Sequence, residues 1–121
     1  MEDKKAKELI NKILTNLDKN GIELPGLIED LKELRTYALA AKIPLAVKVL
    51  RLTYEHLEEN ETFLIPIPED EPVEEEEITE KEETEVQPVE SLSYLISLYK
   101  DLKNKMNLMD LGDYRNALQD F

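Results

Sequence analysis

Apolar side chains recur at every third or fourth position through most of the first 60 residues, which is the spacing of one face of an α-helix. The pattern predicts three helices, over residues 3–19, 25–42 and about 44–59. Asn20-Gly21 is a suitable C-terminal stop for the first helix, because glycine tolerates left-handed geometry. Pro44 disfavours helical geometry in the residue before it and therefore separates the second helix from the third.

The third predicted helix is apolar around most of its circumference. Only a narrow polar stripe interrupts it, formed by Lys48, Arg51, Glu55 and Glu58. A helix with so little polar surface is usually central in its bundle. Leu50 lies on this helix, the one with the narrowest polar stripe, so we expect it to be fully buried.

The pattern breaks off after residue 60. The run Phe63–Pro68 is apolar, but its prolines exclude a helix. Residues 69–87 then hold eleven acidic residues and one lysine, a local charge of −10, with three aliphatic side chains. Such a segment buries too little surface to offset the entropy lost on ordering. We therefore predict a disordered, acidic linker over residues 61–87.

Helical spacing returns at Pro88. One apolar stripe predicts a fourth helix and contains Leu92, Leu95, Ile96, Tyr99, Leu102 and Met106. A weaker pattern from Asp110 to Phe121 predicts a short fifth helix, whose start is made less certain by Gly112.

These elements together predict an all-α fold, a small bundle of four to five helices interrupted by the disordered acidic linker. We expect residues 1–60 to form a three-helix N-terminal part. Residues 88–121 are expected to pack on it, so that both parts make one domain. The order and handedness of the helices stay open, because a long linker permits either orientation.

Charge and composition limit the classes of protein to which the chain can belong. The chain of 121 residues has a net charge of −13, but outside residues 69–87 the charge is only −3. There is no cysteine, which fits a reducing compartment. No apolar run approaches the roughly 20 residues that a membrane helix needs. The sequence therefore predicts a soluble cytoplasmic protein that neither enters a membrane nor binds nucleic acid directly, since we see no basic patch.

The sequence offers little for catalysis. His56 is the single histidine, and the three glycines are isolated, so neither a two-histidine metal site nor a glycine-rich phosphate loop can be built. The serines near residue 91 lie in a helical stripe without a glycine-flanked elbow. We expect no enzyme, no cofactor and no metal.

One segment has half of a calcium-loop pattern. Residues 16–21 place oxygen-bearing side chains at the first, third and fifth positions and glycine at the sixth. The twelfth position is Leu27 instead of a bidentate glutamate, and Pro25 interrupts the incoming helix. A helix C-cap at Asn20-Gly21 explains the same residues more simply.

Two apolar groups are candidates for docking a partner: Phe63, Leu64, Ile65 and Ile67 beside the acidic run, and Tyr94 with Leu98 on the fourth predicted helix. Each has a structural alternative. The first group would cover an open end of its own helical core, and the second would pack in that core; we favour these alternatives.

For function, the sequence favours a non-enzymatic protein-interaction module, an adaptor or regulator that binds another protein through a helical surface. One alternative is an acidic inhibitor that mimics nucleic acid and blocks a basic, nucleic-acid-binding protein. A second alternative is a structural subunit of a larger assembly, which requires self-association.

Overall fold

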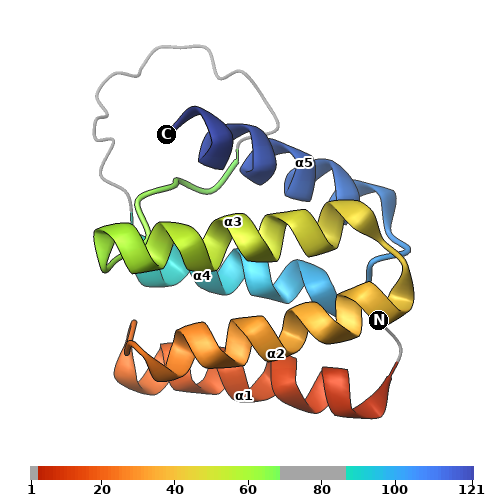
Figure 1. The fold of residues 1–121 in the computed structure, drawn as a ribbon, viewed down its shortest axis with the longest axis horizontal. Coiled ribbons are helices and arrows are strands. Elements are labelled where there is room, and N and C mark those ends of the chain that lie inside the picture. Colours follow the sequence, from red (N-terminus) through yellow and green to blue (C-terminus); the bar gives the residue numbers. More distant parts are fainter. Residues whose placement is uncertain (1–2, 69–86) are drawn as a thin grey trace.

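The computed structural model describes residues 3–68 and 87–121, and every regular element in them is helical. The elements are α1 (Lys4–Asn20), α2 (Gly26–Ala41), α3 (Pro44–Asn60), α4 (Pro88–Ser97), a 3₁₀ turn η2 (Leu98–Lys100) and α5 (Lys105–Asp120) (Figure 1). The predicted all-α class is confirmed. The acidic stretch 69–86, predicted to be disordered, lies outside the described residues.

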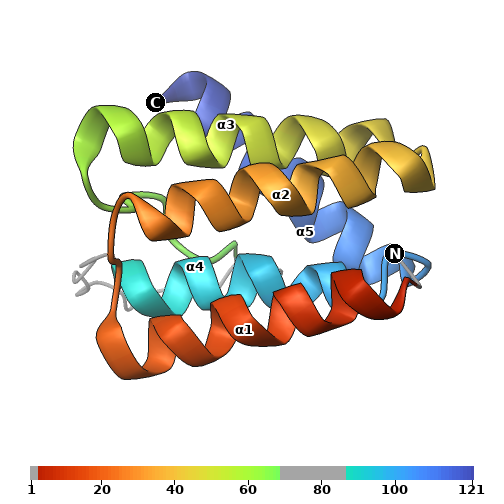
Figure 2. The same ribbon diagram turned by 60° about the horizontal axis from the view of Figure 1, so that its bottom comes forward.

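The helices contact one another in a ring. α1 packs against α2 and α4, α2 against α3, and α3 against α5, while η2 contacts α4 and α5. α1 and α4 lie in one layer and α2 and α3 in another, with α5 behind them (Figure 2). The chain reverses direction between α1 and α2 and again between α2 and α3 (Figures 1 and 2). The structure thus supplies the helix order that the sequence left open.

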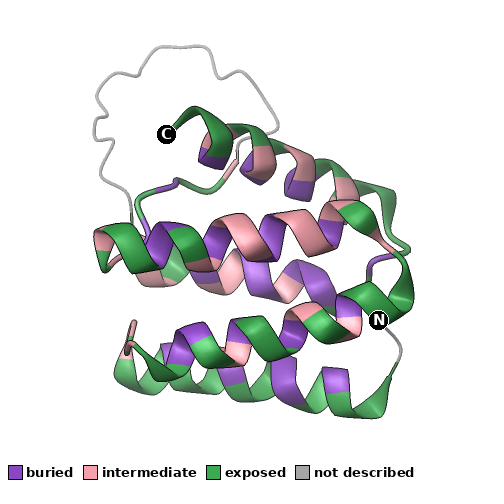
Figure 3. Ribbon diagram, in the orientation of Figure 1, coloured by how far each residue is buried: buried purple, intermediate pink, exposed green. Residues whose placement is uncertain are grey.

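One continuous core fills the ring. The buried residues of each helix face inward (Figure 3) and are aliphatic or tyrosine in most positions. Leu50 of α3 is fully buried, as predicted. Burying such side chains contributes roughly 1.5–3 kcal/mol each and is the main force holding the helices together.

Capping residues explain where α1 begins and ends, and a proline explains where α3 begins. The Asp3 carboxylate accepts a hydrogen bond from the Lys5 backbone N–H at 2.7 Å and caps α1. Gly21 adopts φ 73°, and its N–H donates to the Leu17 carbonyl at 3.0 Å. The predicted C-cap at Asn20-Gly21 is therefore confirmed. Pro44 occupies the first turn of α3, and the residue before it is extended.

The C-terminal helices differ from the prediction. The fourth helix ends at Ser97 instead of continuing to Met106, which is exposed. α5 begins at Lys105, five residues before the predicted start. The reason is an N-cap that the periodicity did not reveal: the Asn104 side chain accepts hydrogen bonds from the backbone N–H groups of Met106 at 2.8 Å and Asn107 at 3.3 Å.

Candidate protein-interaction surface

Residues 61–68, here called the strap, belong to the predicted linker, but Phe63 and Ile65 pack on the bundle, which is the alternative that we favoured from the sequence. Phe63 is fully buried and Ile65 is 3% exposed, whereas Leu64 and Ile67 are 37% and 38% exposed. Alternate side chains of an extended segment point in opposite directions, which explains why Leu64 is exposed between the buried Phe63 and Ile65. Ile67 has the same parity as the buried pair, so alternation does not account for its exposure. Two of the four predicted docking residues of the strap are therefore core residues.

Side chains of the bundle bind the strap backbone. The Leu64 N–H donates to Nε2 of His56 at 3.1 Å, and the Ser91 hydroxyl donates to the Ile65 carbonyl at 2.6 Å. The Tyr114 hydroxyl donates to the Ser91 carbonyl at 3.0 Å. Burial raises the pKa of Tyr114, so its hydroxyl stays protonated and can donate. The strap backbone is thus hydrogen-bonded to side chains of α3 and α4, and Tyr114 of α5 is hydrogen-bonded to Ser91.

His56 packs between aromatic side chains and accepts a hydrogen bond from the strap. Its ring meets Phe63 and Phe121 edge to face, with centroids 5.6 Å and 4.7 Å away. Burial lowers the pKa of His56, partly opposed by the carboxylate of Glu59. The bond from Leu64 requires an unprotonated Nε2, which agrees with the lowered pKa. The histidine therefore acts here as a neutral hydrogen-bond acceptor.

Tyr94 and Leu98, the second predicted docking pair, also serve the interior. Leu98 is buried in η2, and Tyr94 is half-buried. The Tyr94 hydroxyl donates to Oδ2 of Asp110, which is a buried carboxyl group on α5. In the described structure Tyr94 therefore links α4 to α5 and Leu98 belongs to the core, so these two side chains offer little surface to a partner.

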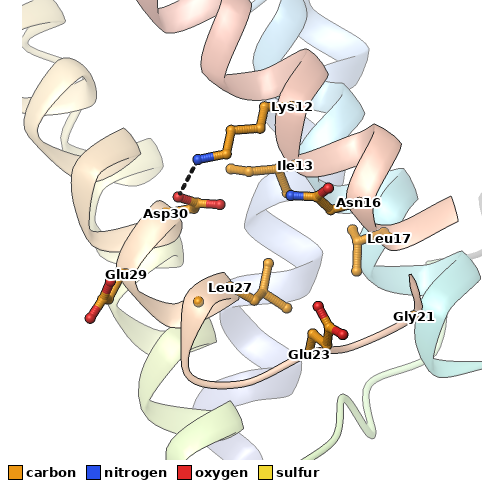
Figure 4. A pocket seen from close by; sticks show the side chains of 10 residues that line it. Lys12, Ile13, Asn16, Leu17, Gly21, Glu23, Leu27, Glu29 and Asp30 are labelled. Atoms are coloured by element: carbon orange, nitrogen blue, oxygen red, sulfur yellow. Dashed lines mark hydrogen bonds and ion pairs between the residues drawn. The ribbon is translucent and has the colours of Figure 1, made fainter. Parts of the chain in front are cut away.

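Residues 16–21, which have half of a calcium-loop pattern, lie at the end of α1, where the chain turns toward α2 (Figure 4). A cavity of about 260 Å³ is found there, beside an ion pair of 3.3 Å between Lys12 and Asp30. Residues 16–20 are helical, so their oxygen-bearing side chains point around the helix and cannot converge on one ion. Across residues 3–68 and 87–121, no three His, Cys, Asp or Glu side chains are placed to hold a metal.

A more open site lies where α2 turns into α3, at the right-hand end of both helices in Figures 1 and 2. A shallow cleft of about 450 Å³ is found there, and we call it the α2–α3 groove. Its lining residues are Arg35, Leu39, Lys42, Ile43, Pro44, Val47, Lys48 and Arg51. Leu39 is 51% exposed, so about half of its apolar side chain is in contact with solvent at the groove.

The basic side chains of the groove have few acidic partners. Arg51 pairs with Glu55 at 3.7 Å on the exposed surface. Among the described residues, Arg35, Lys42 and Lys48 form no ion pair. Nε of Arg35 is buried and has no hydrogen-bond partner in that same part of the chain. The groove therefore combines an apolar floor with uncompensated positive charge.

Sequence reasoning missed this groove, although a signal was present. Residues 34–54 contain four basic residues and no acidic one, in a chain of 28 acidic residues. In α2 the lining residues Arg35 and Leu39 are four positions apart, which places them on one helix face, and Lys42 follows as the C-cap of the helix. Averaging the charge over the whole folded part concealed the basic cluster.

Comparison with known proteins does not extend this picture: no protein-family model, curated protein or solved structure matches the chain. In the described parts of the chain, no helix has the length and apolar character needed to cross a membrane.

Proposed function

We propose that this protein is a non-enzymatic interaction module, an adaptor or regulator that binds another protein through the α2–α3 groove. The observation that carries the proposal is the half-exposed Leu39 in an apolar cleft edged by basic side chains. An apolar centre with a polar rim is the usual anatomy of a protein–protein interface.

Half of the docking residues expected from the sequence are unavailable to a partner, which supports this choice. Phe63, Ile65 and Leu98 are buried within the chain itself. The buried polar side chains of His56, Ser91 and Asp110 each have a hydrogen-bonding partner in the chain. The groove has a volume of about 450 Å³, which accommodates a few partner side chains, and it is lined by four basic residues.

The test is photo-crosslinking in the native cell. A benzoylphenylalanine is placed at position 39, where it preserves an apolar side chain in the groove. The matched control carries it at Met109 of α5, another apolar residue, which is 62% exposed. We expect a discrete protein adduct from position 39 and none from position 109. Absence of an adduct at 39, or the same adducts from both positions, contradicts the proposal.

The same experiment separates the alternatives. A structural subunit that self-associates would give an adduct with the mass of two copies of this chain. An acidic inhibitor would contact its basic target through carboxylates, so position 39, which lies in the acid-free stretch 34–54, would stay uncrosslinked.

A further inference from the structure

The partner class can be stated more closely, and this step rests on the proposed function. We infer that the α2–α3 groove binds an acidic peptide segment of another protein, one that carries at least one large apolar side chain among its carboxylates.

Charge complementarity is the first argument. Four cations line the groove, and three of them, Arg35, Lys42 and Lys48, have no ion pair among the described residues. Arg35 also has a buried Nε without an acceptor. No described residue therefore compensates the charge of Arg35, and a carboxylate on a partner carries the opposite charge.

The floor of the groove is the second argument. Leu39, Ile43 and Val47 present apolar surface between the cations. Ile43 and Val47 are half-buried, and Leu39 is the most exposed of the three. A purely polar ligand would leave this surface in contact with water. An apolar side chain flanked by carboxylates matches both the floor and the rim.

The total charge of the chain argues for a short acidic segment over a long polyanion. A net charge of −13 repels nucleic acid and anionic membranes at distances where the local cations are screened. A peptide with a few carboxylates meets the groove only at close range, so the four cations dominate its interaction.

Binding is measured by fluorescence anisotropy on the full chain, with a short fluorescein-labelled peptide that repeats Glu-Glu-Leu. The double variant Lys42→Gln/Lys48→Gln removes two groove cations. Its matched control, Lys7→Gln/Lys19→Gln, removes two exposed cations of α1 and gives the same net charge. We expect the groove variant to weaken binding about tenfold and the control less than about twofold. Leu39→Ala is expected to weaken binding by several-fold, and Met109→Ala to leave it unchanged.

Several results would overturn the inference. They are no binding at about 1 mM peptide, equal loss in both double variants, equal binding of a Gln-Gln-Leu peptide, or tighter binding of duplex DNA or anionic vesicles than of the peptide. A crosslinked partner at position 39 whose contact region lacks acidic residues would also overturn it, while leaving the proposed function intact.

The chain's own acidic run is a competing polyanion, and a variant tests its role. Replacing Glu74, Glu75, Glu76 and Glu77 by glutamine lowers that charge in the full chain. We expect the peptide to bind as well or better, with amide NMR signals of residues 39–48 unchanged in the free protein. Shifts confined to those amides would identify the chain's own run as the occupant and overturn the inference.

Discussion

The strap and the α2–α3 groove are two apolar regions beside charged residues, but the strap is largely buried and the groove is open to solvent. In the strap, Phe63 and Ile65 are buried against the bundle, and the backbone between and beside them is hydrogen-bonded. In the groove, Leu39 is half-exposed and the nearby cations have few partners.

The two regions differ in how many helices surround them. His56 of α3 and Ser91 of α4 bind the strap backbone, while Tyr114 of α5 bonds Ser91 and its ring lies next to Phe63. The groove lies at a turn between two helices, and its floor is lined by α2 and α3 alone in the described structure. Apolar content alone therefore did not identify the surface that is left open.

The largest expected effect tests the division within the strap. Ile65→Asp places a carboxylate in the core, and we expect it to destabilise the protein by at least about 4 kcal/mol, or to prevent folding. Ile67→Asp, two residues further on at a side chain that is 38% exposed, is expected to cost less than about 1 kcal/mol. Urea denaturation followed by circular dichroism measures both. Similar losses in the two variants would show that the strap is not packed as described.

The next effect compares the two regions directly. Phe63→Ala removes a fully buried ring and is expected to cost about 3–5 kcal/mol. Leu39→Ala in the groove is expected to change the free energy of unfolding by no more than about 0.5 kcal/mol, because half of this side chain is already exposed to water in the folded protein. Free energies of unfolding from urea titrations decide this. A large loss on truncating Leu39 would mean that the groove is part of the core.

A smaller effect concerns the polar anchors of the strap. Ser91→Ala removes the donor to the Ile65 carbonyl and leaves that buried acceptor unpaired, so we expect a loss of about 1–3 kcal/mol. Ser93→Ala, on the same helix and only half-buried, is the control and should change stability by less than about 0.5 kcal/mol. Equal effects of the two substitutions would argue against an anchoring role for Ser91.

The smallest effect is a dependence on pH. Because the pKa of His56 is lowered in the folded protein, the folded state binds fewer protons than the unfolded state. Its contribution to stability is complete above the ordinary pKa of 6.5 and declines as the pH falls from there through the lowered pKa. NMR titration of this single histidine ring should give a pKa below 6.5. His56→Gln should flatten the change in stability between about pH 7 and 5. A pKa at or above the ordinary value would contradict the described environment.

Local signals in the sequence were enough for the first three helices. Their periodicity, the cap at Gly21 and the break before Pro44 depend on residues close to one another in the chain, so short-range geometry determines them. The C-terminal helices were predicted less well, because the apolar spacing runs on past Ser97 while the Asn104 cap starts a new helix.

The sequence by itself thus determined the helical class, the N-terminal boundaries and the burial of residues such as Leu50. Only the tertiary structure decided which apolar residues outside that pattern are covered. Phe63 is buried because α3 and α5 bring His56 and Tyr114 next to it, with ring centroids 5.6 Å and 6.1 Å away. Leu39 stays open because the groove around it is lined only by described residues between 35 and 51, and no distant element of the described chain covers it there. Such coverage depends on elements that are distant in the chain, which periodicity along one helix does not encode.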